Sequence, residues 1–96
     1  MEIGDFQGRM ADQYGTRDSA RGVPATVAWL AEEVGELAKA VRKGSADDQL
    51  HELGDVLAWL ASLANQLGLS LDAAVARYAA ANGCPKCGTS PCTCPP

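Results

Sequence analysis

Apolar residues recur at intervals of three and four along two central stretches of the chain. In residues 24–43 they are Val27, Leu30, Val34, Leu37 and Val41, and in residues 46–67 they are Leu50, Leu53, Leu57, Leu60, Ala64 and Leu67. This spacing puts them on one side of an α-helix. The pattern therefore predicts two long amphipathic helices, one in each stretch.

Residues typical of helix ends flank both stretches. Pro24 suits a first helical turn, and Gly44 is a natural cap after residue 43. Ser45, with Asp48 three residues later, is able to begin the next helix, and Gly68 ends it. Because so short a turn joins them, the two helices are expected to run antiparallel.

Two weaker helices are expected outside this pair, at residues 3–14 and 71–82. Gly15 would end the first, before a loop at residues 16–23, and Gly83 would end the second. No alternation typical of strands competes with them. The fold class is therefore predicted to be all-α, an antiparallel bundle of about four helices. Residues 1–83 would form the domain, and residues 84–96 would form a tail rich in cysteine and proline.

The length and net charge of the chain limit the classes of partner that it is expected to bind. A chain of 96 residues buries a modest core, so a homodimer or homotetramer is expected. The net charge of −4 argues against a nucleic-acid polymer or an anionic membrane as partner. No apolar run reaches the length of a membrane span. Charged residues interrupt residues 1–15, which excludes a signal peptide, and a cytoplasmic location is expected.

Four acids in the two central helices carry the main chemical signal. Glu33 and Glu36 are three residues apart and share a helix face, as do Glu52 and Asp55. Glu36 and Glu52 each lie eight residues from Gly44, whereas Glu33 and Asp55 each lie eleven residues from it. Equal counts mean equal heights in an antiparallel hairpin. Two cross-helix pairs of carboxylates are therefore predicted.

Four carboxylates held this closely repel one another unless a cation joins them. Oxygen ligands suit a hard divalent ion, so Mg²⁺ or Mn²⁺ is the predicted cofactor. A di-iron centre is disfavoured, because the chain has no Glu-x-x-His motif and His51 is expected off the acidic face. Gly35 and Gly54 lie beside the acids, where close helix approach or room for a ligand would offset their cost of about 1 kcal/mol each.

The alternative interpretation treats the acids as an ordinary solvated helix surface. Lys39, three residues after Glu36, would then be its partner. None of the residues four positions after the acids is basic; they are Leu37, Ala40, Val56 and Trp59. This pattern favours the metal site over ordinary Glu–Lys pairing.

At these motifs the chain resembles the MazG-like all-α nucleotide pyrophosphohydrolases. Glu32-Glu33-x-x-Glu36 followed by Glu52-x-x-Asp55 matches the EExxE…ExxD signature of that family. The resemblance implies metal-dependent hydrolysis of a nucleoside triphosphate to the monophosphate and pyrophosphate by an oligomeric bundle. It implies that Glu32 is an auxiliary catalytic acid and that the other four acids are catalytic metal ligands.

Two alternatives to this function stay open. One is a related enzyme with the same metal site, a phosphoribosyl-ATP or dUTP-type pyrophosphohydrolase, because no base-reading motif is legible. The other is a non-catalytic helical oligomer whose zinc-binding tail recruits a partner. Resemblance of fold alone does not set the substrate.

Seven further residues are candidates for substrate or phosphate binding. Trp29 and Trp59 each lie fifteen residues from Gly44, so a base would be able to stack on either ring, although packing aromatics are the alternative. Lys39 would meet phosphates or end its helix in solvent. Asn65 and Arg77 occupy places where the family often has polar or basic residues that help to bind nucleotide. Arg17 and Arg21, in the predicted loop, would reach a phosphate across a dimer.

All four cysteines lie in the tail, as Cys84, Cys87, Cys92 and Cys94. In a reducing compartment such a cluster indicates a metal before a disulfide. The first pair has the spacing of a zinc half-site, whereas the second pair is tighter than is usual. A structural zinc knuckle is one interpretation, and a proline-rich tail with free thiols is the other.

Overall fold

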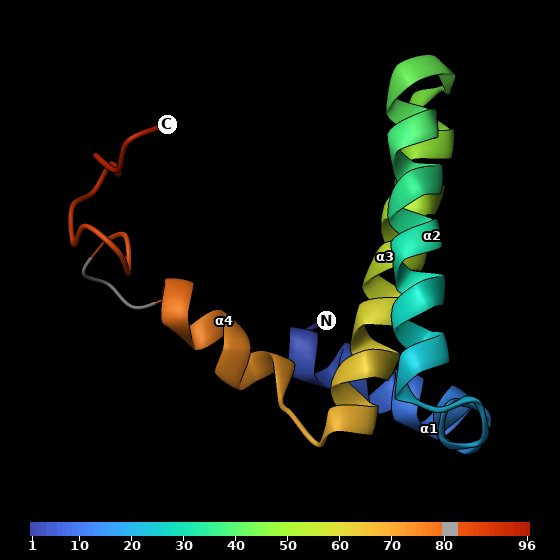
Figure 1. Ribbon diagram of the computed structural model, residues 1–96. Helices are drawn as coiled ribbons and strands as arrows, with labels where there is room; N and C mark the ends of the chain where they lie inside the picture. The colour runs from blue at the N-terminus through green and yellow to red at the C-terminus, as the bar shows by residue number, and fades with distance from the viewer. Residues whose placement is uncertain (80–82) are drawn as a thin grey trace.

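The computed structural model describes residues 1–79 and 83–96, and in these residues it contains four helices and no strand. Helices α2 (Val23–Lys43) and α3 (Ala46–Leu67) lie side by side and antiparallel (Figure 1). Their bounds agree with the predicted ones to within one residue. The all-α class and the central hairpin are thereby confirmed.

The turn of the hairpin is closed by local hydrogen bonds. The Ser45 hydroxyl accepts from the Asp48 N–H at 3.2 Å, and the Asp48 carboxylate accepts from the Ser45 N–H at 2.9 Å. This reciprocal pair is the predicted capping box of α3. At Gly44 a β-carbon would lie 2.8 Å from the carbonyl oxygen of Ala40, so the chain needs glycine to leave α2 here.

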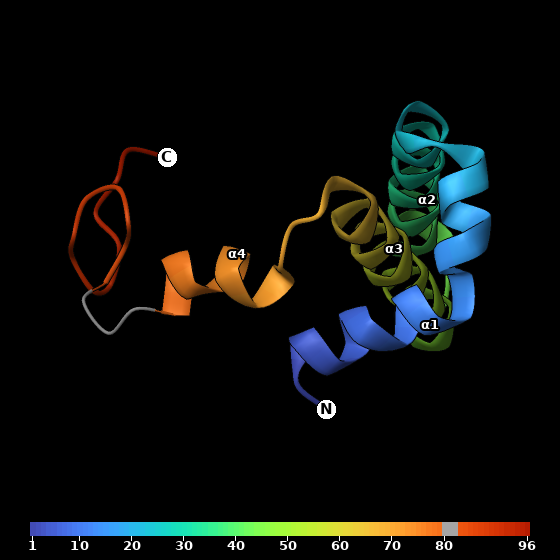
Figure 2. The same ribbon diagram turned by 90° about the horizontal axis from the view of Figure 1, so that it is seen from below.

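Helix α1 (Ile3–Arg21) is longer than predicted. Gly15 lies inside it and does not end it, and the expected loop at residues 16–23 is largely helical. A glycine within a helix costs about 1 kcal/mol, which the packing of α1 against α3 offsets. The helix ends instead at Gly22, whose φ of 87° suits glycine. Helix α1 lies across the end of the hairpin that is opposite Gly44 (Figures 1 and 2).

Gln7 holds the first half of α1 in place. Its side-chain amide donates to Asn65 Oδ1 at 3.0 Å and to the carbonyl oxygen of Leu69 at 2.8 Å. Its side-chain oxygen accepts from the Leu71 N–H at 2.8 Å. One side chain thus joins α1 to the end of α3 and to the start of the next helix.

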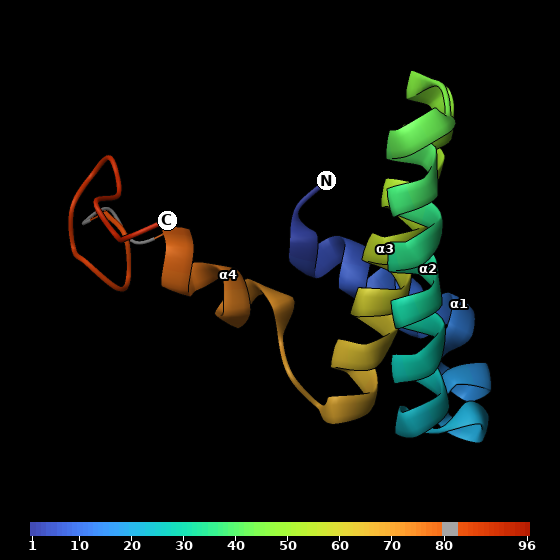
Figure 3. The same cartoon turned by 45° about the horizontal axis from the view of Figure 1, so that its top comes forward.

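Helix α4 (Leu71–Ala79) leads away from the hairpin, and the cysteine tail follows it (Figures 1 and 3). Ser70 caps it by accepting from the Ala73 N–H at 3.2 Å. The last three residues predicted for this helix, 80–82, lie outside the described residues. Within the described part of the chain, no helix combines the length and apolar character needed to cross a membrane.

The core is made of small residues. Ala40, Ala61 and Ala64 are the buried apolar residues among those described, together with the buried polar residues Asp18, Thr26 and Ser62. The large apolar residues of the hairpin stripe stay partly in solvent; they include Val27, Val34, Val41, Leu50, Leu53, Leu57 and Leu60. A single chain therefore leaves much of its amphipathic face uncovered.

Candidate active site

The acids of the two signature motifs lie along the hairpin, in the middle turns of α2 and the first half of α3. Glu33, Glu52 and Asp55 are half-buried, whereas Glu32 and Glu36 are exposed. The helix periodicity sets their spacing on each element, and the antiparallel hairpin sets their heights. Ligand atoms of Glu52 and Asp55 lie within 4.8 Å of each other. Glu33 and Glu36 are outside that group, although the charges of Glu36, Glu52 and Asp55 act on Glu33.

Glu33 feels the acids across the hairpin. Its pKa is raised above the ordinary glutamate value, first by partial loss of water and next by the charges of Asp55 and Glu52 on α3. The acids of its own helix, Glu36 and Glu32, add smaller contributions. A cation among these carboxylates would relieve the repulsion. The electrostatics therefore mark this cluster as a place suited to a positive ligand.

Glu36 and Glu52 also share a shallow cavity of about 300 Å³ beside the turn. Lys39 and Lys43 of α2 line the same cavity, with Asp48 from the start of α3. Three carboxylates and two ammonium groups therefore face one space. Such a mixed lining suits a ligand with both phosphate oxygens and a coordinated cation.

His51 belongs to the cluster, although the sequence suggested that it points elsewhere. Its Nε2 lies 3.3 Å from Asp55 Oδ2, and donor atoms of His51, Glu52 and Asp55 all lie within 4.8 Å of one another. The expectation that His51 lies off the acidic face was wrong. The sequence signal for this contact is the spacing, because His51 precedes Asp55 by four residues and such residues share a helix face.

A second cavity, of about 310 Å³, opens between α1 and α3 next to the acids. Asp55 and Trp59 line it from α3, and Arg17, Asp18 and Arg21 line it from α1, with Tyr14, Ala58 and Ser62 completing the wall. Arg17 and Arg21 had been expected in a loop that reaches across a dimer. They lie instead on a helix and face the acids of their own chain.

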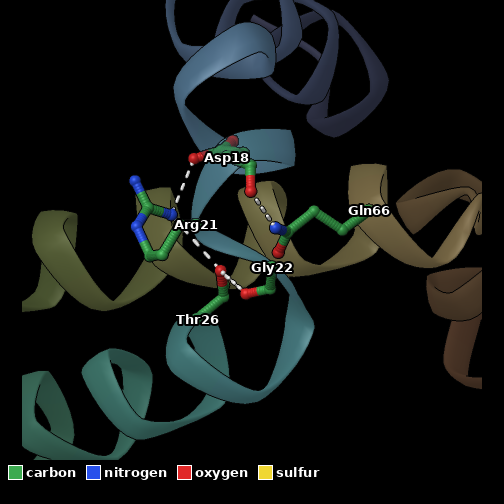
Figure 4. A network of polar contacts seen from close by, with 5 residues as sticks. All are labelled: Asp18, Arg21, Gly22, Thr26 and Gln66. Carbon is green, nitrogen blue, oxygen red and sulfur yellow. Dashed lines mark hydrogen bonds and ion pairs between the residues drawn. The ribbon is translucent and has the colours of Figure 1, made fainter.

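Asp18 is the residue that the sequence did not single out. It is 2% exposed, and its Oδ1 accepts from Arg21 Nη1 at 2.9 Å. Arg21 Nη1 also donates to Thr26 Oγ1 at 3.2 Å, and Gln66 donates to the backbone oxygen of Asp18 (Figure 4). This network fixes the corner between α1 and α2 against α3.

One oxygen of Asp18 stays unpaired in this network. Oδ2 is buried and has no hydrogen-bond partner among the described residues. A buried acceptor without a donor is unfavourable by about 1–3 kcal/mol. Because Asp18 lines the cavity beside Asp55, a ligand that carries N–H or O–H groups would satisfy it there.

Trp29 and Trp59 stack on each other, as their equal distances from the turn suggested. Their ring centroids are 5.8 Å apart and their planes differ by 15°. The guanidinium carbon of Arg21 lies 4.6 Å from the centre of the Trp59 ring. Trp59 thus has two partners, whereas Trp29 contacts the Trp59 ring and is 45% exposed. Packing and base stacking both stay predictions for these rings.

Two other candidate residues are held away from the acids. The Asn65 side chain is engaged by Gln7, from which it accepts at 3.0 Å and to whose backbone oxygen it donates at 3.2 Å. Arg77 lies on α4, with its guanidinium carbon 5.3 Å from the centre of the Tyr78 ring. Neither residue lines the two cavities that border the acids, and their role in substrate binding stays a prediction.

Gly35 and Gly54 do not mark a close approach of the two helices. A β-carbon at either position would meet no atom within 4 Å. The interpretation that these glycines let the helices come together was therefore wrong. The alternative, that the glycines leave room for a ligand beside the acids, agrees with the open space at both positions.

The comparisons with known proteins agree with the motifs. The model of the MazG nucleotide pyrophosphohydrolase domain matches residues 21–80, which is more than half of the chain and includes both acidic motifs. No curated protein matches the chain significantly.

Proposed function

Because the chain belongs to the MazG nucleotide pyrophosphohydrolase family, we propose that it hydrolyses a nucleoside triphosphate between the α and β phosphates. The products would be the nucleoside monophosphate and pyrophosphate, and the enzyme would serve to clear unwanted nucleotides. The observation that carries the proposal is the convergence of acids on Glu33 from both helices of the hairpin.

The donor set fits Mg²⁺ or Mn²⁺. Glu33, Glu36, Glu52 and Asp55 offer only carboxylate oxygens, which these ions prefer. The pKa of Glu33 is raised first by partial loss of water and next by the charges of neighbouring acids, and a divalent ion would cancel the second contribution. Bound there, the ion would neutralise phosphate charge and lower the pKa of a water molecule. The chain therefore has the residues for a magnesium-dependent site.

The remaining groups of the site have roles that follow from their charge and place. Lys39 and Lys43 would attract phosphate oxygens at the cavity beside the turn. Glu32, exposed on α2, would orient water as the auxiliary acid. A carboxylate not fully engaged by metal would accept the proton from the attacking water.

The cavity between α1 and α3 would hold part of the nucleotide. It borders Asp55, so a ligand that reaches the acids also reaches this space. Arg17 would meet phosphate there, and the unpaired Oδ2 of Asp18 would accept from an amino group of the base or a hydroxyl of the sugar. Trp29, Trp59, Asn65 and Arg77 would contribute less directly, through packing or through a neighbouring chain.

The enzyme would work as a homodimer or homotetramer. The apolar stripe of the hairpin is partly in solvent; Val34, for example, is 49% exposed and Leu57 is 44% exposed. Partial exposure of a continuous apolar stripe is typical of an interface between chains. A second hairpin packed on this face would supply the core that one chain lacks.

A substrate panel tests the reaction. Purified protein would be incubated with Mg²⁺ and canonical and modified (deoxy)nucleoside triphosphates, and pyrophosphate and orthophosphate would be measured separately. The panel would include phosphoribosyl-ATP and dUTP, which identify the two related enzymes. We expect pyrophosphate release that needs metal and that falls at least about 100-fold in Glu36→Gln, since even outer-shell changes cost 10–100-fold.

Glu2→Gln is the matched control. It makes the same substitution at an exposed acid before α1, where the side chain makes no capping hydrogen bond. Full activity in this variant and loss in Glu36→Gln would support the proposal. No turnover of any triphosphate, together with no Mg²⁺ binding, would refute it and favour a non-catalytic helical oligomer.

A further inference from the structure

The cysteine tail gathers all four of its thiols into one cluster. Ligand atoms of Cys84, Cys87, Cys92 and Cys94 lie within 4.8 Å of one another. The four thiols are free cysteines, not disulfides. Four sulfur atoms so close together in a tail of thirteen residues need a reason, because nothing in the tail resembles an apolar core.

Two sulfur separations in the cluster match the edge length of a metal tetrahedron. Cys84 Sγ lies 3.7 Å from Cys94 Sγ, and Cys87 Sγ lies 3.8 Å from Cys92 Sγ. Sulfur atoms placed tetrahedrally about 2.3 Å from a zinc ion are about 3.8 Å apart. A covalent disulfide would instead bring two of them to about 2.05 Å.

We propose that Cys84, Cys87, Cys92 and Cys94 form a structural zinc site that folds the tail. The close sulfur contacts are nested, since they join the outer cysteines to each other and the inner cysteines to each other. All four thiolates would bind one ion, so Cys92 and Cys94 would share it although only Thr93 separates them.

Backbone N–H groups point at three of the sulfur atoms. Lys86 N lies 3.4 Å from Cys84 Sγ, and Thr93 N lies 3.4 Å from Cys87 Sγ. Cys94 N lies 3.3 Å from Cys92 Sγ. Such donors stabilise sulfur that carries negative charge and orient it toward a metal. The tail therefore provides an outer shell as well as ligands.

Backbone hydrogen bonds help to close the loop that carries the cysteines. Cys84 N–H donates to the carbonyl oxygen of Thr89 at 3.0 Å, and Gly88 N–H donates to that of Cys84 at 2.7 Å. Gly88 has a φ of 73°, and a β-carbon on Gly83 would lie 2.7 Å from the Thr89 backbone. Both glycines thus permit the tight path that brings the thiols together.

The chemistry separates this site from the acidic one. Thiolates select soft or borderline ions such as zinc, whereas carboxylates select magnesium. Four protein ligands leave no open position, which is typical of a structural and not a catalytic zinc site. The tail also lies beyond α4, away from the hairpin (Figures 1 and 2). Zinc would therefore hold the tail without entering the hydrolytic reaction.

Metal analysis of the full chain tests the proposal. Protein purified under reducing conditions without chelator would be analysed for metals by mass spectrometry. In a second sample the bound zinc would be replaced by Co²⁺. We expect about one zinc per chain and the visible and near-ultraviolet bands of tetrahedral cobalt bound by thiolates. Cys94→Ser is expected to lower zinc affinity at least about 100-fold, measured by competition with a chromophoric chelator.

Lys86→Ala is the matched control inside the tail, because Lys86 contributes only its backbone N–H to the cluster. It should keep full zinc affinity. Far-ultraviolet circular dichroism would show that the helices of Cys94→Ser are unchanged. Zinc-free protein that also fails to bind added zinc, a disulfide between tail cysteines in reduced preparations, or unchanged affinity in Cys94→Ser would each overturn the proposal.

Discussion

The acidic hairpin and the cysteine tail both gather four ligand side chains, but they do so by different means. The hairpin uses two long helices, so each ligand is placed by counting residues from Gly44. The tail uses a short loop, closed by backbone hydrogen bonds such as that from Cys84 N–H to the Thr89 oxygen. Regular structure lets sequence spacing place ligands, whereas a loop places them through its particular turns.

The two regions also differ in what holds them when no ion is bound. The hairpin has caps, a small alanine core and the network around Asp18. The tail has few buried groups, since Cys92 is exposed and the other three cysteines are half-buried. Metal removal should therefore leave the hairpin folded and release the tail. The following three predictions test this difference.

Asp55→Asn should have the largest effect and should be confined to the hairpin. Asp55 is a predicted metal ligand that also borders the cavity between α1 and α3. Removing its charge should lower Mg²⁺ affinity and turnover at least about 100-fold, because even outer-shell changes cost 10–100-fold. Mg²⁺ titration calorimetry and the pyrophosphate assay would measure this, and the zinc content of the same sample should stay unchanged.

His51→Gln is the control for Asp55→Asn. It removes the partner 3.3 Å from Asp55 and keeps the carboxylate, so turnover should change only a few-fold. If Asp55→Asn kept full Mg²⁺ affinity, Asp55 would not be a ligand. If it lowered the zinc content, the two regions would not be independent.

Asp18→Asn should destabilise the helical part of the molecule by about 2 kcal/mol. The variant loses the charge that receives the Arg21 hydrogen bond at a buried position, and hydrogen bonds to charged groups are worth about 1.5–3 kcal/mol. Urea unfolding followed by circular dichroism would measure this. Asp12→Asn, at an exposed acid of the same helix, should change stability little, and equal effects of the two variants would contradict the role of the network.

Ser45→Ala should cost about 1 kcal/mol, the usual value for a lost helix cap. The hydrogen bonds from Ser45 to Asp48 lower the pKa of that carboxyl. The capping box therefore contributes stability above the ordinary aspartate pKa, and this contribution is lost as the pH falls through the lowered value. Ser45→Ala keeps the backbone N–H that donates to the Asp48 carboxylate, so Asp48→Asn tests the pH-dependent part. Its difference from the wild type in unfolding midpoint should shrink on acidification.

Ser70→Ala removes the matching cap of α4, where Ser70 accepts from the Ala73 N–H. Since α4 is exposed along most of its length and leads away from the hairpin, this variant should leave the main unfolding transition nearly unchanged. A loss as large as that of Ser45→Ala would mean that α4 and the hairpin unfold as one unit.

Much of the hairpin was predictable from the sequence, whereas its surroundings were not. Periodic apolar residues, Gly44 and the Ser45–Asp48 pair predicted α2 and α3, because these signals act within a few residues of one another. Gly15 misled the prediction for α1, because a glycine ends a helix only where no tertiary packing outweighs its cost. The pairing of His51 with Asp55 is consistent with their spacing of four residues in one helix.

By itself the sequence determined the two central helices, the spacing of the four acids in two pairs about Gly44, and the motifs of the MazG family. Each of these depends on residue type and on distance along the chain. Only the tertiary structure decided that α1 lies across the hairpin and brings Asp18 and Arg21 to the edge of the site. The same is true of the pairing of the outer and inner tail cysteines. These contacts depend on how the helices pack and on the path of a loop. The periodicity of the sequence predicts neither.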